Sequence, residues 1–339
     1  MTIDVTGLSL RDFTSCGGCA AKADASLLKL LRSAAYDQQG IDTLVGLAAP
    51  DDAAVTAINE TTSLITTVDF FPPVVSYAFE YGYVSALNSL SDIYAMGGLA
   101  KTALLVCGFP KEIADAEISA CVSGAALACK EADVEILGGH TVRITEPIFG
   151  LAATGYVHPG AIWRKTGMVD GDLLMLSRPL GVGVLLSTRE QSDEEVALEQ
   201  MKVSNLGARN SLTKLGLAVH AVTDVTGFGL IGHLSEMLGE SFLNAQVQLP
   251  SQAVLPQAQS LFDSGKRTSA DSRNRAALGR EIEGITENNS QAALFDPQTN
   301  GGLLASIDPA FEIQLVEQGF ITVGKVVTGS GKIEVLSNQ

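Results

Sequence analysis

Basic residues are scarce in this sequence relative to acidic ones. The 339 residues contain 22 Lys and Arg against 38 Asp and Glu, which gives a formal net charge of −16. Nucleic acids and anionic membrane surfaces attract basic protein surfaces, so this balance argues against both as partners. An acidic chain still accommodates an anionic nucleotide if Mg²⁺ mediates and the acids are its ligands.

Long apolar runs and cysteines are also few. No segment approaches the ~20 apolar residues of a membrane span, and the stretch from Met1 to Arg11 lacks the basic-then-apolar pattern of a secretory signal. The five cysteines cannot all pair, and sparse, odd usage in a long chain is typical of a reducing compartment. We therefore expect a cytoplasmic protein in which Cys107, Cys121 and Cys129 are buried as small hydrophobic residues.

Two common catalytic motifs are absent. The sequence contains no Gly-x-x-x-x-Gly-Lys-Ser/Thr phosphate loop, which excludes an ordinary P-loop enzyme. It also contains no Gly-x-Ser-x-Gly nucleophile elbow.

The composition and the hydrophobic patterns predict a two-domain protein of the α/β class. Hydrophobic residues make up 46% of the chain, and a prior of roughly 100–200 residues per domain favours two domains. Glycine and proline residues between His158 and Asp172 indicate the boundary between the domains, which gives domains at 1–160 and 161–339. The expected strands are 63–69, 101–108, 134–137, 147–157, 173–176 and 221–224; the expected helices are 77–96, about 112–130, 180–190, 193–215 and 229–238. The polar stretch 264–275 is expected to be a flexible loop.

The segment Ser15–Lys22 combines two thiols, Cys16 and Cys19, with two glycines and the amine of Lys22. A thiol near a lysine and a helix start has a lowered pKa, and the thiolate is the nucleophile. No second cysteine pair or nearby histidine supports a zinc site, and too little chain precedes Cys16 for a thioredoxin-like motif. On its own, the segment leaves redox, metal and nucleophile chemistry open.

Five acids are candidates for a cation and nucleotide site: Asp51, Asp52, Asp69, Asp92 and Asp224. For each acid taken alone, helix or turn capping is the favoured explanation, and only the set as a whole points to a site. Asp92, however, lies near the C-terminal end of its predicted helix, where the helix dipole disfavours an anion. Carboxylates from separate elements are ligands that Mg²⁺ commonly uses together with substrate phosphates.

A glycine turn is expected at Gly138-Gly139-His140, directly after a buried strand. Such a turn lets backbone approach a phosphate or ribose closely. His140 is, from its local sequence, equally a ligand-contacting residue or a core histidine.

Together these motifs resemble the selenophosphate synthetase (selenide, water dikinase) family over nearly the whole chain. The matching segments are Cys19-Ala20-Ala21-Lys22, Asp51–Val55, Thr67–Phe71, Ser91–Gly98, Gly138–His140, Glu146–Leu151, Thr223–His233 and Asp296–Leu304.

The resemblance implies a fold like that of aminoimidazole ribonucleotide synthetase, with two domains and a homodimer formed through the N-terminal halves. It implies the reaction ATP + selenide + water → selenophosphate + orthophosphate + AMP. Cys19 matches the catalytic cysteine and Lys22 the essential lysine, which also meets ATP, both on a mobile N-terminal lid. Asp52, Asp92 and Asp224 match the family's metal-binding acids, and Asp92 also matches a nucleotide-contacting position. Asp51 and Asp69 match further nucleotide-contacting positions. Gly138, Gly139 and His140 match positions that contact the ATP of a neighbouring subunit. Selenide and a selenium-delivery protein are the implied further partners.

The chain departs from this family at one position. Some bacterial relatives carry a second cysteine directly before the lysine, where this sequence has Ala21 and instead an extra Cys16. A Cys16–Cys19 disulfide acting as an off switch is a hypothesis motivated by the spacing. The alternatives are another ATP enzyme of the same superfold, such as a purine-biosynthetic synthetase or thiamine-phosphate kinase, and a selenium- or sulfur-binding redox module.

Overall fold

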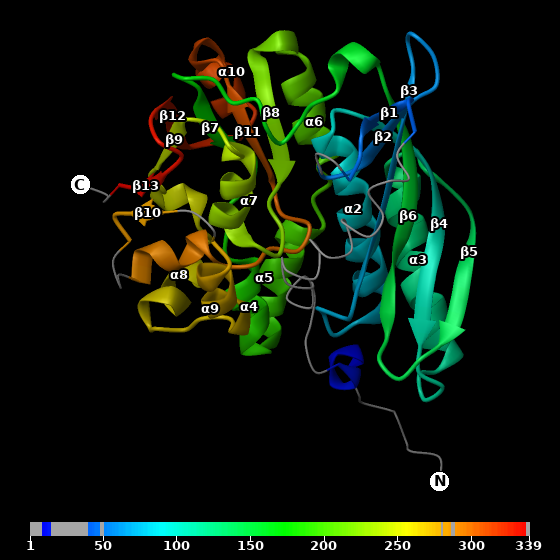
Figure 1. Cartoon of the computed structure of the whole chain (residues 1–339). Coiled ribbons are helices and arrows are strands. Elements are labelled where there is room, and N and C mark those ends of the chain that lie inside the picture. Colours follow the sequence, from blue (N-terminus) through cyan, green and yellow to red (C-terminus); the bar gives the residue numbers. More distant parts are fainter. Residues whose placement is uncertain (1–8, 15–39, 48–50, 279–280, 286–288, 337–339) are drawn as a thin grey trace.

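The computed structural model describes residues 9–14, 40–47, 51–278, 281–285 and 289–336. These residues form two β-sheets with their helices, one sheet in each half of the chain (Figure 1). Within these ranges, no helix has the length and apolar character needed to cross a membrane.

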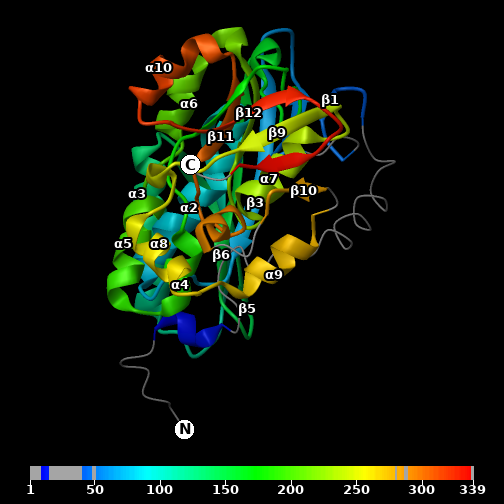
Figure 2. The same cartoon turned by 90° about the vertical axis from the view of Figure 1, so that its left-hand side faces the viewer.

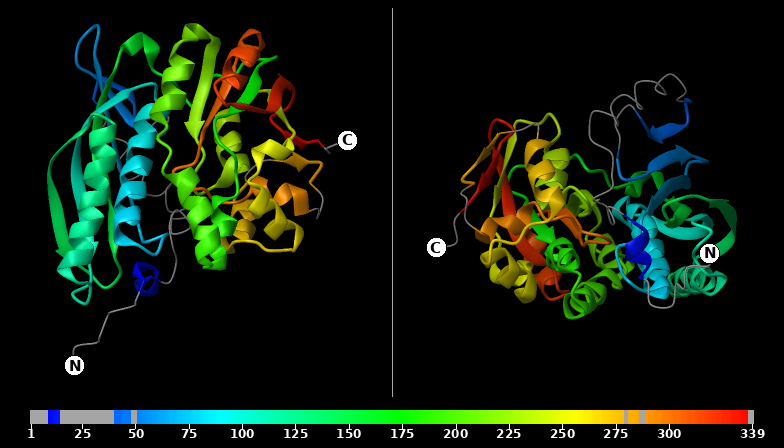
Figure 3. Two further views of the ribbon diagram at one scale, coloured as in Figure 1. Left: turned by 180° about the vertical axis from the view of Figure 1, so that it is seen from behind. Right: turned by 90° about the horizontal axis from the view of Figure 1, so that it is seen from below.

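The N-terminal sheet has six strands in the order β1-β2-β3-β6-β4-β5. Their bounds are Thr43–Val45 (β1), Ala54–Ala57 (β2), Ser63–Phe71 (β3), Leu99–Phe109 (β4), Glu135–Arg143 (β5) and Ile148–Val157 (β6). All neighbours pair antiparallel except β4 and β5, which are parallel. Helices α2 (Ala78–Ala95) and α3 (Asp115–Glu131) cover one face, and no helix of the described ranges covers the other (Figure 3).

Glycines set the close contact between α2 and α3. A Cβ atom on Gly82 would lie 1.8 Å from the carbonyl oxygen of Cys121, and one on Gly124 would lie 2.0 Å from that of Phe79. The two helix backbones therefore meet at distances that only glycine permits. As expected, Cys107, Cys121 and Cys129 are buried in this layer.

The C-terminal sheet has seven strands in the order β10-β13-β9-β12-β7-β11-β8. The strands are β7 (Leu173–Leu176), β8 (Val219–Asp224), β9 (Leu243–Val247), β10 (Ile282–Glu283), β11 (Leu303–Ile307), β12 (Ile321–Thr328) and β13 (Ile333–Val335). The helices are α4 (Val182–Thr188), α5 (Gln191–Met201), α6 (Leu206–Thr213), α7 (Gly229–Leu238), α8 (Pro256–Asp263), α9 (Ser269–Ala276) and α10 (Glu312–Val316). Figure 2 shows helices on both sides of this sheet.

Successive residues of β7 reach different parts of the core. Leu174 and Leu176 belong to the large cluster shared with α4, α7 and α8, whereas Met175 belongs to a second cluster with α6 and α10. Because side chains alternate along a strand, both faces of this sheet are buried. The mixed, mainly antiparallel sheets make each domain a layered α+β unit.

Two expectations for local structure were wrong. Residues 264–275, expected as a flexible loop, include α9, which tertiary contacts stabilise: Asn274 donates hydrogen bonds to the carbonyls of Gly227 and Phe295. Gly138 and Gly139, expected in a turn, lie inside β5 and pair with β4. Their φ angles of +154° and +156° suit glycine, and a Cβ on Gly139 would meet the Leu105 carbonyl at 2.3 Å.

Candidate active site

Three of the predicted acids come together where the two domains meet. Asp52 lies two residues before β2, Asp92 lies in the last turn of α2, and Asp224 is the last residue of β8. Their mutual proximity shows in their electrostatics, because the charges of Asp224 and Asp52 both raise the pKa of Asp92. The predicted convergence of carboxylates from different elements is therefore present in the fold.

Burial and crowding raise the pKa values of Asp52 and Asp92. Burial, followed by the charges of Asp224, Asp69 and Asp52, raises the pKa of Asp92 well above its ordinary value. Burial also raises the pKa of Asp52 to about 8, against the opposing effect of Lys165. The Asp52 side chain is 4% exposed, and its buried Oδ2 atom has no hydrogen-bond partner among the residues that the structure describes.

Uncharged donors fix the orientation of the three carboxylates. The hydroxyl of Thr67 donates to Asp92 Oδ2 at 2.5 Å, and that of Ser91 donates to Asp224 Oδ2 at 2.7 Å. The hydroxyl of Thr223 donates to Asp52 Oδ1 at 3.1 Å. Each bond joins residues from different elements, so the acid geometry depends on the packing of both domains.

Lys165 is a cation of this site that the sequence patterns did not reveal. Its ammonium lies 2.9 Å from Asp52 Oδ1 and 3.0 Å from Glu236 Oε2. Its backbone N–H donates to both carboxylate oxygens of Asp51, at 3.2 and 3.0 Å. Burial alone would lower the pKa of Lys165, but Asp52 and Glu236 raise it, so the side chain stays charged.

Asp69 belongs to a neighbouring amide network. Its carboxylate accepts a hydrogen bond from the side-chain amide of Asn88, and Asn88 Oδ1 accepts one from the backbone N–H of Asn300 at 2.6 Å. Asn88 and Asp92 lie one turn apart on α2, as the spacing predicts. The Asp296–Leu304 segment of the C-terminal domain is thereby linked through Asn88 to Asp69 of the N-terminal domain.

Arg178 organises the C-terminal side of the site. This buried guanidinium donates to the carbonyls of Asn300 and Gly301 at 2.7 and 2.6 Å and to Asn205 Oδ1 at 3.0 Å. The amide of Asn205 in turn donates to the hydroxyl of Ser91 at 2.8 Å. A continuous chain of hydrogen bonds therefore connects Arg178 to the residue that holds Asp224.

His233 shapes a loop. It is 3% exposed, and its Nε2 atom accepts a hydrogen bond from the backbone N–H of Thr226 at 3.1 Å. This bond fixes the turn that follows Asp224 and begins α7.

Other predicted residues lie elsewhere. Gly138, Gly139 and His140 are exposed on β5, the edge strand, which β4 and β6 separate from β3. Cys19 and Lys22, like Cys16, lie outside the described residues.

The donor set suits a hard divalent cation. In the described part of the chain, no group of three His, Cys, Asp or Glu side chains is arranged so that it could hold a metal ion without movement of the side chains. The pKa values of Asp52 and Asp92 are nevertheless raised, and Asp52 Oδ2 is buried with no hydrogen-bond partner among the described residues. Carboxylate oxygens are the hard ligands that Mg²⁺ prefers, and a cation here would offset the crowding of these acids, so the residues fit this ion.

A cavity of about 490 Å³ opens beside Asp51 and Asp52. Ala54, Thr66, Val68 and Ala152, on the face of the N-terminal sheet opposite α2 and α3, form part of its wall, together with Gly46, Leu47 and Thr67. Its size is that of a small-molecule site, and it lies directly next to the acids.

Comparison with known proteins assigns the family. Models of AIR synthase related proteins match the chain, the N-terminal domain at residues 50–157 and the C-terminal domain at residues 169–331. Across 350 aligned residues, 98% of each chain, the sequence is 36% identical to the selenide, water dikinase of Burkholderia pseudomallei. The chain belongs to the selenide, water dikinase family of enzymes. The dikinase of Pseudomonas straminea is 35% identical over 99% of this chain and 100% of its own.

Solved structures share the dikinase fold at lower identity. AaThiL complexed with AMPPCP and TMP is 17% identical, with a TM-score of 0.68 over 93% of this chain and 96% of its own. A thiamine-monophosphate kinase from Stenotrophomonas maltophilia is 22% identical, with a TM-score of 0.64 over 92% and 96%. These similarities confirm the predicted AIR synthase-like architecture.

Proposed function

We propose that this chain makes selenophosphate by the reaction ATP + selenide + water → selenophosphate + orthophosphate + AMP. The observation that carries the proposal is the meeting of Asp52, Asp92 and Asp224 from both domains, in a chain that matches dikinases over nearly its whole length. A nucleotide substrate is supported by neighbours of the same fold, of which one was solved with AMPPCP and another with ATP.

Asp52, Asp92 and Asp224 are the proposed Mg²⁺ ligands. When bound, Mg²⁺ neutralises phosphate charge and holds the triphosphate in line for attack. Thr67 and Ser91 keep two of these carboxylates oriented before any ligand arrives, which reduces the cost of assembling the site. Because burial raises the pKa values of Asp52 and Asp92, metal binding to these two acids is favoured as the pH rises.

The nucleotide is proposed to occupy the cavity beside Asp51, with Asp69 and Asp92 among its contacts. Cys19 and Lys22 are proposed to act from the N-terminal lid that the family resemblance implies. A thiolate at Cys19 is a soft group suited to handling the soft selenium atom, and Lys22 adds positive charge opposite the phosphates.

The face of the N-terminal sheet opposite α2 and α3 is the proposed homodimer surface. Large side chains lie exposed on it: Val68 and Phe70 are 56% and 46% exposed and Leu104 is 48% exposed. An apolar face of this kind marks an interaction surface. His140 pairs in register with Val106, and Val106 pairs with Gly150. Because residues paired in register lie on the same face of a sheet, His140 lies on the face that lines the proposed nucleotide cavity.

A facing copy therefore explains how Gly138, Gly139 and His140 reach a partner's nucleotide although they lie far from their own carboxylates. Val68→Asp is expected to convert a dimer to monomers in analytical ultracentrifugation. A matched Ile313→Asp change, on the exposed α10, is expected to leave the dimer intact. A monomeric unmodified protein would contradict this part of the proposal.

The remaining parts of the proposal concern organisation and cellular context. We place the ATP/Mg²⁺-binding and dimerisation domain at 1–160 and the second domain at 161–339. We also propose that a delivery protein donates the selenium, because free selenide is reactive. A cytoplasmic location is proposed because the cysteines are few and odd in number.

Nucleotide product analysis tests the reaction. Anaerobic incubation with MgATP is expected to give AMP only when selenide is present. Asp224→Asn is expected to reduce the rate by roughly 100-fold or more, because it removes a proposed metal ligand. ADP as the product would instead support a kinase of the same fold, and full activity in Cys19→Ser would remove the cysteine from the mechanism.

A further inference from the structure

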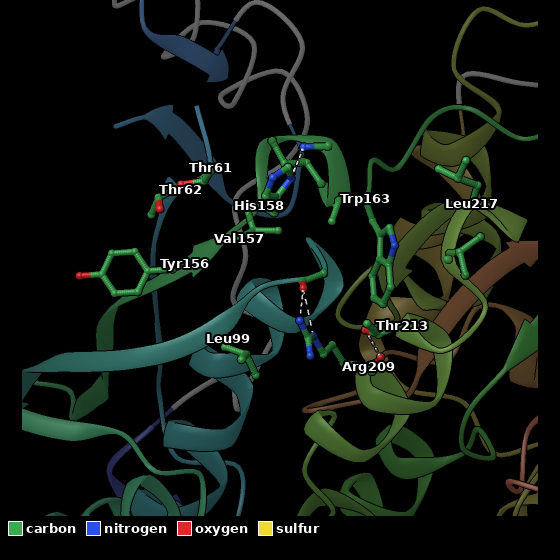
Figure 4. Close-up of a pocket in the computed structure, with 16 residues that line it drawn as sticks. Thr61, Thr62, Leu99, Tyr156, Val157, His158, Trp163, Arg209, Thr213 and Leu217 are labelled. Atoms are coloured by element: carbon green, nitrogen blue, oxygen red, sulfur yellow. Dashed lines mark hydrogen bonds between the residues drawn. The ribbon is translucent and has the colours of Figure 1, made fainter. Parts of the chain in front are cut away.

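A second cavity, of about 470 Å³, opens between the two domains. None of the five acids of the candidate active site lines it. In Figure 4, His158 lies in the turn that follows the N-terminal sheet, Arg209 and Leu217 come from the other domain, and Trp163 stands between them, whereas the ring of Tyr156 points away from Trp163. Its volume is within the range of small-molecule sites.

Arg209 brings an uncompensated positive charge to this cavity. Its Nε and Nη2 atoms donate to the carbonyl of Gly97 at 3.0 and 2.7 Å, and Nη1 donates to Asn210 Oδ1 at 3.1 Å. Among the described residues, no Asp or Glu forms an ion pair with it. Burial lowers the pKa of this guanidinium, and an anion would offset the cost of burying the charge.

His158 adds a directed donor. Its Nδ1 atom accepts a hydrogen bond from the backbone N–H of Gly160 at 3.0 Å. In the neutral ring this places the proton on Nε2, which is then a donor. The cavity therefore receives a cation from one domain and an imidazole N–H donor from the other.

Flat and apolar side chains form the other walls. Trp163 is 9% exposed, while Tyr156, Leu99 and Leu217 are 44%, 41% and 90% exposed. Aromatic rings of this kind pack favourably on planar ligands. One side of the cavity thus suits a flat ring, and Arg209 suits a negative charge.

We propose that this cavity is a second ligand site, which binds a small organic anion made of one flat ring and one phosphate or carboxylate group. Arg209 and His158 recognise the anionic group, and Trp163 contacts the ring. The site is separate from the reaction proposed above and does not depend on it.

Tryptophan fluorescence reads the site directly, because the chain has a single tryptophan and it is Trp163. Titration of the full chain without Mg²⁺ is expected to give a saturable change with AMP, the phosphate probe, or with nicotinate, the carboxylate probe; the stronger binder identifies the anionic group. Adenosine and inorganic phosphate, which each lack one half of AMP, are expected to bind at least about tenfold more weakly than AMP if AMP is the ligand. Leu217→Glu and Arg209→Gln are expected to weaken binding by about tenfold or more.

Two further variants make the result decisive. Leu217 is 90% exposed, so its change to Glu adds repulsion without threatening the fold, and Ile313→Glu on the 75% exposed Ile313 is the matched control that keeps binding. Asp224→Asn is also expected to keep binding, because the acid lies at the other site. Absence of a saturable change with both probes, full binding by Leu217→Glu, or loss of binding in Asp224→Asn would each overturn the proposal.

Discussion

At the scale of single residues, the site combines acids that the sequence motifs identified with partner residues that the motifs did not reveal. Asp52, Asp92 and Asp224 precede or end distinct elements, which made them visible as candidates. Lys165 lies in a segment between two elements, where no periodicity marks it, yet its ammonium is 2.9 Å from Asp52. Long-range pairing of this kind is set by the fold and has no local signal.

The raised pKa of Asp52 predicts a pH-dependent stability. In the unfolded chain this acid loses its proton near pH 3.8, whereas in the fold the pKa is about 8. Between these values the folded state binds more protons, so its contribution to stability is lost as the pH rises toward 8. Urea denaturation of metal-free protein is expected to show this loss, and Asp52→Asn is expected to reduce it. An unchanged pH dependence in the variant would argue against the assignment.

Ser91→Ala tests whether the hydroxyl network serves the acids. Ser91 donates to Asp224 and accepts from Asn205, so its loss leaves the carboxylate without an orienting donor. Such partners typically alter metal affinity or activity by about 10–100-fold. A Mg²⁺ titration of turnover is expected to show this shift, whereas Ser123→Ala, on α3, is expected to match the unmodified protein. Equal Mg²⁺ requirements would contradict the orienting role.

At the scale of elements, strong periodicity predicted the structure well and tertiary contacts decided the exceptions. The apolar stripe and glycine stop of residues 77–96 correspond to α2, and the β-branched run 63–69 corresponds to β3. The polar segment 264–275 carries no such stripe, and α9 forms there because Asn274 and Arg275 contact the chain near Phe295. Propensity alone does not contain that information.

Two glycine substitutions separate packing from helix propensity. Gly82→Ala places a Cβ 1.8 Å from the Cys121 carbonyl oxygen, so the helices must separate, at a cost of about 1–3 kcal/mol or more. Gly207, in the exposed start of α6, has no atom within 4 Å of an added Cβ. Gly207→Ala is therefore expected to stabilise by about 0.5–1 kcal/mol. Thermal denaturation checks both signs, and similar effects at the two sites would contradict this account of α2–α3 packing.

At the scale of the whole molecule, one core cluster runs through both domains, and polar links fasten them. Glu194 of α5 accepts from Arg11 at 3.2 Å and from the backbone and hydroxyl of Ser76 at 2.6 and 2.7 Å. The division into two domains could be predicted from the chain length and from the glycine and proline residues between His158 and Asp172. The strand orders could not, because they follow from contacts between distant segments such as β8 and β11.

Removing the Glu194 carboxylate is expected to destabilise the molecule strongly. The side chains of Arg11 and Glu194 are only 13% and 6% exposed, and Glu194→Ala leaves the guanidinium without its partner, at a cost of about 3 kcal/mol. Lys101→Ala breaks the exposed Lys101–Asp133 pair and is expected to cost less than about 1 kcal/mol. Urea denaturation of the two variants compares them, and equal losses would contradict the role of Glu194 in joining the domains.

Phosphorus NMR of the complete reaction tests the central claim most directly. Protein, MgATP and selenide are incubated without oxygen, and all phosphorus species are followed together. The account predicts that selenophosphate, orthophosphate and AMP appear in equal amounts, that Asp224→Asn forms them at least roughly 100-fold more slowly, and that none of them forms without Mg²⁺. Formation of ADP with a different phosphorylated product, or ATP left intact in the presence of selenide, would contradict it.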